Sequence, residues 1–275
     1  MRHPILTRWS TSLAVLAVAV LAVSLGAAPA SAITHGDLDG DAHPYVGLMV
    51  AKDADGNPLW RCSGTLLSST VYLTAGHCTQ APAASADIWF GSDLTDAAAI
   101  DFPKHGDASG VTRTHPDYDP ANFVVRDVGV VLLDVPYELD QYGALPALDT
   151  FDAASTQRQI KNSGFTTVGY GVQKMFPEAS AWKTESLRLR MVATPRLVQV
   201  NTNSTGNYSL LLSANADTGG ACSGDSGGPN FLGDSNVVGA VTSSAKSDLC
   251  RGSAGVFRMD RSWALNWVGG YLAGR

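Results

Sequence analysis

Short apolar runs separated by turn residues are the feature that most restricts how this 275-residue chain can fold. The runs are rich in β-branched and aromatic residues, and Gly, Pro, Asp and Asn cluster between them, as is typical of strands joined by turns. The pattern therefore predicts an all-β sandwich or barrel. We expect strands over residues 44–50, 59–67, 70–74, 87–90, 124–135, 165–172, 187–200, 210–214, 237–243 and 255–257.

The other segments complete this prediction. Residues 91–110 and 136–160 are polar or rich in Pro and acidic residues, and we expect both to form long loops. Only residues 261–272 have apolar spacing that suits a helix. The chain is therefore predicted to be all-β with a single C-terminal helix.

The N-terminal segment differs in character from the rest of the chain. Two arginines precede an apolar run over residues 13–25, which ends in the small residues Ala30-Ser31-Ala32. This order is typical of a secretory signal peptide. A transmembrane anchor is the alternative, but the apolar run is short for a bilayer span and no basic cluster follows it. We therefore expect a signal peptide at residues 1–32 and a secreted domain at residues 33–275.

The charge balance limits the possible partners. The chain is 45% hydrophobic and 16% charged, which is a globular composition. Cleavage after Ala32 would remove Arg2 and Arg8 and change the formal net charge from −6 to −8. An acidic domain has no electrostatic basis for binding nucleic acid or anionic membranes, so we expect neither as a partner.

All four cysteines, Cys62, Cys78, Cys222 and Cys250, lie in the predicted secreted domain. An even number suggests two disulfides, for which three pairings are possible. Pairing of nearest neighbours would close two modest loops, each stabilising the fold by about 3 kcal/mol. Zinc binding is the alternative, but the chain has no Cys-x-x-Cys pair. We expect no metal.

A serine within a run of small residues is the first candidate for chemistry. Ser226 lies in Cys222-Ser-Gly-Asp-Ser-Gly-Gly-Pro229, where glycines permit a tight loop that aims N–H groups at one point. A serine hydroxyl is a weak nucleophile unless a base takes its proton and donors stabilise the oxyanion that forms. A surface turn is the alternative interpretation of such a run.

Two upstream residues could supply what Ser226 needs. His77 can act as a general base because the pKa of histidine lies near neutrality. Asp127 lies in an apolar run, where a carboxylate is costly without a hydrogen-bonding partner, and orienting His77 would provide one. A structural histidine and an ion pair between Asp127 and Arg126 are the alternatives. Asp134 is a weaker candidate for the carboxylate.

The segments around these residues resemble the signatures of the chymotrypsin/trypsin-like serine proteases, in that family's order of His, Asp and Ser. The resemblance covers essentially the whole predicted secreted domain, and we interpret the chain as a secreted, bacterial-type member. It implies two antiparallel six-stranded β-barrels with the three residues at their junction, and disulfides Cys62–Cys78 and Cys222–Cys250. The matching segments are Thr74-Ala-Gly-His-Cys78, Asp127-Val-Gly-Val-Val-Leu-Leu133, Gly224-Asp-Ser-Gly-Gly-Pro229, Cys62-Ser-Gly-Thr65 and Gly169-Tyr-Gly171.

The resemblance also implies an activity. Ser226 would attack a peptide carbonyl while His77 takes its proton, and the N–H groups of Gly224 and Ser226 would bind the oxyanion. No metal or cofactor is needed for this hydrolysis. We expect a monomer whose partners are protein or peptide substrates and protein inhibitors. The alternative is a secreted homologue that binds proteins without cutting them.

The family also pairs a newly exposed amino terminus with the aspartate before the catalytic serine. Here these residues are Ile33 and Asp225, and Ile33-Thr-His-Gly36 matches the family's terminus at its first and fourth positions. The predicted signal-peptide site lies directly before Ile33. We therefore expect signal peptidase itself to generate the active terminus.

The positions that align with the family's specificity pocket are uncharged. Gly220 and Gly255 align with its floor, and Thr242-Ser243-Ser244 with its wall. This predicts cleavage after an uncharged residue, small or medium apolar rather than aromatic. Ser244 in place of a glycine would narrow the entrance, and Asp248 would reach the pocket only if the alignment slips.

Overall fold

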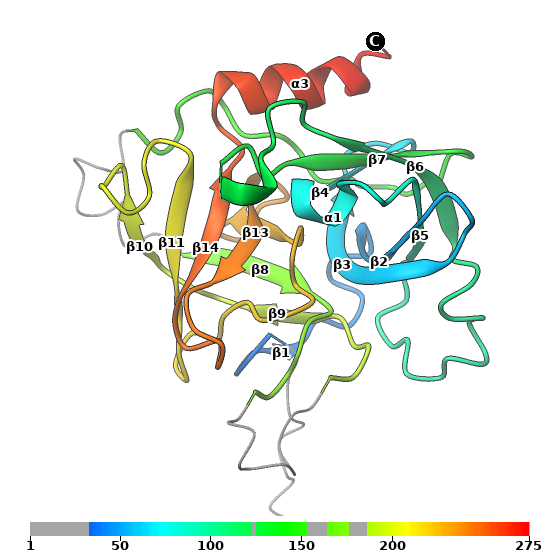
Figure 1. Cartoon of the computed structure of the whole chain (residues 1–275). Helices are drawn as coiled ribbons and strands as arrows, with labels where there is room; N and C mark the ends of the chain where they lie inside the picture. The colour runs from blue at the N-terminus through cyan, green and yellow to red at the C-terminus, as the bar shows by residue number, and fades with distance from the viewer. Residues whose placement is uncertain (1–32, 123–124, 153–163, 176–185, 275) are drawn as a thin grey trace, which may run out of the picture.

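The first half of the chain forms a closed barrel. The computed structural model describes residues 33–122, 125–152, 164–175 and 186–274 (Figure 1). Six antiparallel strands close in the order β2-β3-β4-β7-β6-β5. They are β2 (Val46–Lys52), β3 (Pro58–Leu66), β4 (Val71–Thr74), β5 (Ser85–Trp89), β6 (Ala108–Thr114) and β7 (Gly129–Leu133).

The second half forms an eight-stranded antiparallel sheet in the order β1-β9-β8-β12-β13-β14-β11-β10, which makes a half-barrel. The all-β fold class is thus confirmed, but this half-barrel has eight strands, including β1 from the start of the chain, and is not the closed six-stranded barrel that the resemblance implied. The strands are β1 (Asp37–Leu38), β8 (Phe165–Gly169), β9 (Met191–Ala193), β10 (Leu197–Val200), β11 (Ser209–Ala214), β12 (Pro229–Leu232), β13 (Val238–Ala245) and β14 (Gly252–Arg258).

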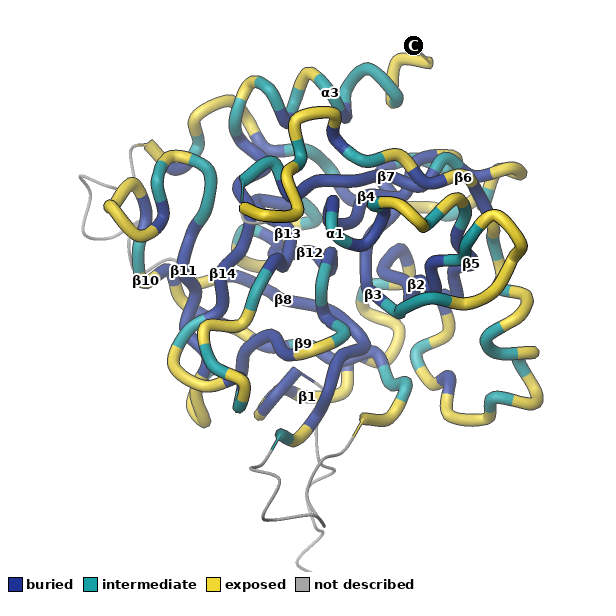
Figure 2. Tube along the Cα trace, viewed as in Figure 1, coloured by how far each residue is buried: buried dark blue, intermediate teal, exposed yellow. Residues whose placement is uncertain are grey.

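Helices contribute little to this architecture. The described ranges hold the short α1 (Gly76–Thr79), a 3₁₀ turn at Pro120–Asn122, and the C-terminal helix α3 (Ser262–Leu272), which confirms the predicted helix. In Figure 1, α1 lies between the two sheets and α3 crosses one end of the molecule. The strands are mostly buried and the connecting loops exposed, so the core lies inside the two sheets (Figure 2).

Several predicted strands are wrong in their limits. The expected loop at residues 91–110 contains the start of β6, and β12 and the two-residue β1 were not predicted. The expected strand at residues 187–200 is two strands, β9 and β10, separated by Pro195, whose ring fixes φ and removes the N–H donor that a central strand uses. The apolar run at residues 124–135 is a strand only over Gly129–Leu133.

Helix α3 packs on the segment that precedes β7. The ring of Trp263 contacts His115, with 5.8 Å between ring centroids, and the guanidinium of Arg126 lies 3.9 Å from the Trp263 ring centroid. Arg126 is thus held by a cation–π contact. No ion pair joins it to Asp127 among the described residues, which removes the structural alternative for that carboxylate.

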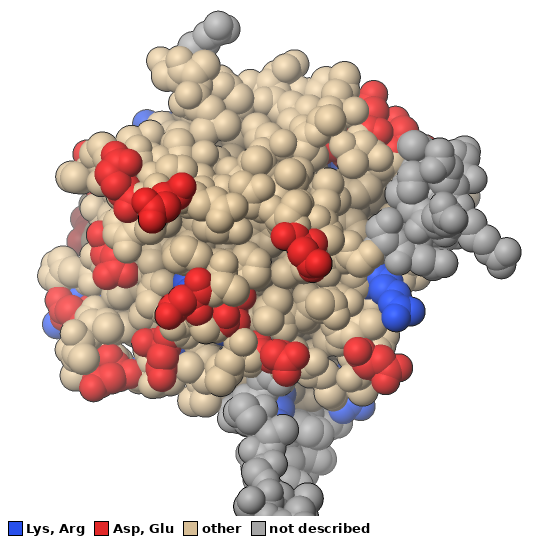
Figure 3. Space-filling model, turned by 180° about the vertical axis from the view of Figure 1, so that it is seen from behind, with Lys and Arg blue, Asp and Glu red and all other residues tan. Residues whose placement is uncertain are grey.

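The surface carries more acid than base, as the sequence predicts. Figure 3 shows Asp and Glu side chains spread over the rear face, with few Lys or Arg between them. None of the helices in the described ranges is long and apolar enough to cross a bilayer. The predicted signal peptide, residues 1–32, lies outside the described residues.

Candidate active site

The barrel brings His77 and Asp127 together. His77 lies in α1 just after β4, and Asp127 lies just before β7, the strand that pairs with β4. His77 Nδ1 lies 2.9 Å from Asp127 Oδ2 and 3.1 Å from Oδ1, and the backbone N–H of His77 donates to Oδ1 at 2.8 Å. Because Asp127 is fully buried, these contacts hold its carboxylate against the imidazole.

The second sheet supplies another hydrogen bond to Asp127. The Oγ of Ser243 donates to Asp127 Oδ2 at 2.6 Å. The β13–β14 register shifts between Thr242 and Ser244, and a bulge of this kind re-aims a side chain. Ser243 was expected only in the pocket wall. A bulge has no single-residue signal, so the sequence could not reveal this contact.

The Ser226 loop is fastened to both halves of the molecule. The Ser63 N–H, in β3, donates to the Ser226 carbonyl at 2.8 Å, and Ser63 Oγ donates to the Gly224 carbonyl at 2.9 Å. The Gly227 N–H donates to Thr242 in β13 at 2.7 Å. Gly227 has φ of +78°, and a Cβ there would lie 2.0 Å from Thr74 Oγ1, so only glycine fits.

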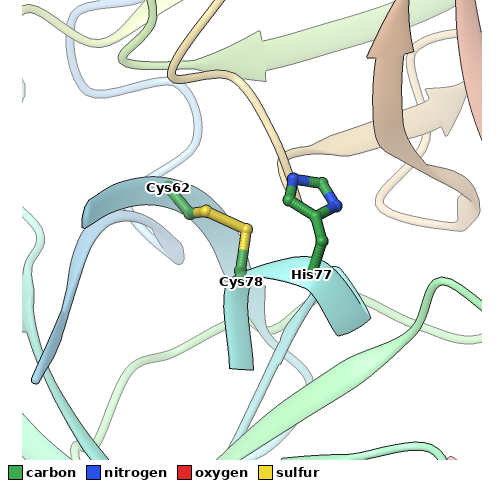
Figure 4. A group of neighbouring side chains, drawn as sticks. All are labelled: Cys62, His77 and Cys78. Carbon is green, nitrogen blue, oxygen red and sulfur yellow. A yellow bond between two sulfur atoms is a disulfide. The ribbon is translucent and has the colours of Figure 1, made fainter. Parts of the chain in front are cut away.

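Disulfides fix the loops around the site and confirm the predicted pairing. They join Cys62 to Cys78 and Cys222 to Cys250. Figure 4 shows the first beside the imidazole of His77, which projects from α1. The sulfur and nitrogen atoms of this group lie within 4.8 Å of one another, but the two sulfurs are bonded to each other and are therefore not thiolate ligands for a metal.

The same disulfide brings the His77 loop to the Ser226 loop. Cys78 Sγ lies 3.7 Å from the carbonyl oxygen of Ser226. Within the described residues, no hydrogen bond joins the Ser226 hydroxyl to His77. Hydrogen bonds of this kind are often long without substrate and tighten in the Michaelis complex.

The loop also presents two backbone donors. Gly224 has φ of +96°, a conformation that favours glycine, and a Cβ there would lie 3.0 Å from Gly171 Cα. Among the described hydrogen bonds, neither the Gly224 N–H nor the Ser226 N–H donates to another protein group. Both are therefore available to an oxyanion.

Asp225 is buried beneath this loop, and no counter-charge of the described residues contacts it. Its carboxylate accepts hydrogen bonds from the Gly171 N–H at 2.7 Å and the Cys222 N–H at 2.9 Å. Burial raises the pKa of Asp225 to about 7, although the two N–H donors and the charge of Arg61 oppose the shift. The site could thus accommodate a cation.

Ile33 is separated from this carboxylate by intervening residues. Its side chain is fully buried and packs with Met191, whose partner across the sheet is Gly169. A Cβ on Gly169 would lie 2.4 Å from Asp225 Oδ1, so Gly169 adjoins both Met191 and the carboxylate. The described residues show no contact between Ile33 and Asp225; in the uncut chain the Ile33 nitrogen is a neutral amide.

The raised pKa of Asp225 predicts how stability depends on pH in the uncut chain. The folded carboxyl holds its proton up to about pH 7, whereas the unfolded one ionises near pH 4. The unfolded state therefore binds fewer protons in this window, and the free energy of unfolding should fall by up to about 4 kcal/mol as pH rises through it.

Urea unfolding of the Ser226→Ala chain between pH 4 and pH 8, with and without Asp225→Asn, measures this slope. Asp225→Asn should remove it, and should lower stability at pH 4, where Asp225 is protonated, because its amide accepts only one of the two N–H donors. Identical slopes in both chains would show that Asp225 ionises normally.

A cavity of about 240 Å³ adjoins Ser226. It is lined by Ala221, Cys222, Ser223, Ser226, Thr242, Ser243, Ser244 and Ala245. All three predicted wall residues are present, and the lining extends one residue further, to Ala245. It has no charged side chain.

Neither of the two predicted floor glycines, Gly220 and Gly255, lines this cavity. A Cβ on Gly255 would lie 2.6 Å from Ser244 Oγ, so this hydroxyl fills the space beside Gly255. Gly220 is bridged to Thr34 and is crowded by Ala214. Ser244 Oγ is also the one buried side-chain oxygen or nitrogen of the described residues without a hydrogen-bond partner.

This fold and site define the class of the protein. The family model named Trypsin matches residues 39–260, and the chain belongs to the trypsin family of serine proteases. The chain is 30% identical to a chymotrypsin of Phaedon cochleariae, covering 82% of this chain and 76% of the relative. It is 27% identical to granzyme M of Homo sapiens, in a match that covers 83% of this chain and 84% of the relative.

Solved structures show the same fold. The structure described as HL collagenase superposes with a TM-score of 0.65 at 19% identity, covering 88% of this chain and 99% of the other. Human heparin binding protein superposes with a TM-score of 0.62 at 17% identity, covering 88% of this chain and 97% of the other. The relatives reported above are animal proteins, so the interpretation as a bacterial-type member is not supported.

Proposed function

We propose that this protein is a secreted serine endopeptidase in which His77, Asp127 and Ser226 form the catalytic triad. The observation that carries the proposal is the buried Asp127 carboxylate, which accepts hydrogen bonds from His77 and Ser243 beside the Ser226 loop. Members of the trypsin family are serine peptidases that act on protein or peptide substrates, and this chain keeps the residues that the chemistry requires.

Each residue has a defined task in this mechanism. His77 Nδ1–H donates to Asp127, which leaves Nε2 to accept the proton of Ser226 as its oxygen attacks the peptide carbonyl. The Gly224 and Ser226 N–H groups stabilise the oxyanion, and imidazolium then protonates the leaving amine. Water repeats the sequence on the acyl-enzyme and releases the acid.

The second candidate is a homologue that binds proteins without cutting them. The fold does not exclude it, because the structures that superpose include one named as a heparin binding protein. The N–H groups of Gly224 and Ser226 donate to no other group among the described hydrogen bonds, and this favours the enzyme over the binding protein.

Covalent labelling separates the two candidates. A fluorophosphonate probe should label the chain that begins at Ile33, with loss of peptide hydrolysis in proportion, because only an activated serine reacts with it. Ser226→Ala should abolish both signals, and Ser235→Ala, in the exposed turn after β12, is the matched control. Labelling that persists in Ser226→Ala, or is absent from the active-length chain, would contradict the proposal.

We also propose that residues 1–32 direct secretion and that their removal activates the protein. The Ile33 amine that this cleavage exposes would then pair with Asp225. Ile33 has φ of +53° in the uncut chain, which is an unfavourable conformation for a β-branched residue. Cleavage removes the carbonyl that defines this torsion. The buried carboxylate gains a counter-charge at the same time.

The cavity favours an uncharged side chain before the cleaved bond. Its lining has no charge, and Ser244 Oγ takes up space beside Gly255. Both features fit a small or medium side chain better than an aromatic ring or a cation. A peptide panel in which cleavage is fastest after Arg would overturn this preference.

A further inference from the structure

Arg61 lies beside the loop that holds Ser226. It precedes Cys62 in β3, and its side chain is partly buried. A Cβ placed on Gly224 would lie 3.5 Å from Arg61 Nε, so the guanidinium flanks one of the two oxyanion donors. A cation in this position can act on a bound substrate.

Arg61 belongs to the same half of the molecule as His77, which protonates the leaving group in the proposed mechanism. The cavity for the acyl part of a substrate is built by residues of the second sheet and its loop, 221–223 and 242–245. His77, which protonates the leaving amine, belongs to the barrel, as does Arg61 in β3. A chain with its acyl part in the cavity therefore continues past Ser226 toward Arg61.

Arg61 differs from the structural arginines of the same molecule. Arg190 and Arg258 are fully buried, and each contacts an aspartate within 3 Å. Arg61 has no carboxylate within 4 Å among the described residues, and its hydrogen-bond partner is the hydroxyl of Ser186. Its charge acts on the buried Asp225 only beyond ion-pair distance, so no carboxylate contacts the guanidinium among the described residues.

A second arginine adds to the positive charge at this place. Arg188 lies near enough to Arg61 for their charges to repel. It is held in place by the carbonyls of Leu94 and Thr95, at 2.8 and 2.7 Å, and lies over the ring of Phe102. Among the described residues, neither Arg61 nor Arg188 forms an ion pair with a carboxylate, so two neighbouring positive charges face the site.

We propose that Arg61, supported by Arg188, forms a carboxylate-binding subsite for the first or second residue after the cleaved bond. This inference rests on the proposed endopeptidase function and adds to it a substrate class, namely chains with Asp or Glu just beyond the scissile bond. A guanidinium suits a carboxylate because its planar donors match the two oxygens. A free C-terminal carboxylate at the same distance has the same chemistry.

Internally quenched peptides test the subsite. They share the residues before the cleaved bond and carry Glu or Gln at the first or second position after it. The ratio of kcat/KM for Glu over Gln should be about fivefold in the wild-type enzyme, as expected for a half-exposed ion pair. It should fall to about one in Arg61→Gln and shrink between 0.05 and 0.5 M NaCl. Arg196→Gln, which removes an exposed charge beside Gly164, should keep it.

The ratio separates a subsite from a structural role, because a merely structural Arg61 would lower both rates equally. A wild-type ratio near one, or an unchanged ratio in Arg61→Gln, would overturn the inference. Peptides that end two residues after the bond, as free acid or amide, identify the source of the carboxylate. A preference for Glu assigns the carboxylate to a side chain and supports the subsite. A preference for the free acid alone, with a Glu-to-Gln ratio near one, assigns it to the chain end and overturns the proposed preference for Asp or Glu.

A binding measurement keeps this inference separate from the proposed function. The dissociation constants of fluorescein-labelled forms of the same peptides are measured by fluorescence anisotropy. The two proteins compared are the Ser226→Ala variant and the Ser226→Ala/Arg61→Gln variant. Tighter binding of the Glu peptide to the first variant alone supports the subsite even if no peptide is cut. Equal affinity for Glu and Gln in the first variant would overturn it, whatever the fate of the catalytic proposal.

Discussion

Replacing Asp127 by Asn should lower kcat/KM about 10⁴-fold, the size of loss found for the equivalent change in a protease of this fold. The carboxylate accepts from the His77 backbone N–H, His77 Nδ1 and Ser243 Oγ. An amide must turn its NH₂ group toward one of these partners. If that partner is Nδ1, the ring proton moves to Nε2, which can then no longer accept the proton of Ser226.

Steady-state hydrolysis of a peptide substrate measures this loss, and the rate of fluorophosphonate labelling should fall with it. Asp134→Asn is the matched control: Asp134 is exposed, accepts a hydrogen bond from Ser109, and should change the rate less than twofold. An Asp127→Asn enzyme that folds normally and keeps more than a tenth of the activity would refute the assigned role.

Retaining even one residue before Ile33 should lower kcat/KM about 10²- to 10³-fold relative to the chain that begins at Ile33. The free amine would neutralise a buried carboxylate, and loss of one partner of a buried ion pair costs about 3–5 kcal/mol. With no amine, Asp225 stays protonated below about pH 7 and forms no ion pair beneath the loop that carries Gly224 and Ser226.

Chains beginning at Ile33 and at Ala32, each with and without Asp225→Asn, form a thermodynamic cycle for this pair. Asp225→Asn should cause a large loss in the chain from Ile33 and a much smaller one in the chain from Ala32. Equal losses in both, or full activity of the extended chain, would show that the amine and Asp225 act independently.

The sequence determined the fold class and the chemistry-bearing residues, because each leaves a local signal. β-branched runs between turns indicated most strands, and His77, Asp127 and Ser226 lie in short segments whose composition is unusual. The cysteine count indicated two disulfides, which the structure pairs as the resemblance implied. These features depend on neighbours within a few residues.

Contacts distant along the chain were decided by tertiary structure alone. β6 has few apolar residues, and its pattern alone does not indicate a strand. Its Gly110 packs closely against β7, where a Cβ would lie 2.2 Å from the Leu132 carbonyl oxygen. Ser243 reaches Asp127 through a bulge, and Ser63 links β3 to the Ser226 loop. Arg61 gains its place beside Gly224 only when the barrel and the second sheet meet. The contacts of Ser243, Ser63 and Arg61 join residues more than a hundred positions apart, and no local pattern in a single sequence encodes them.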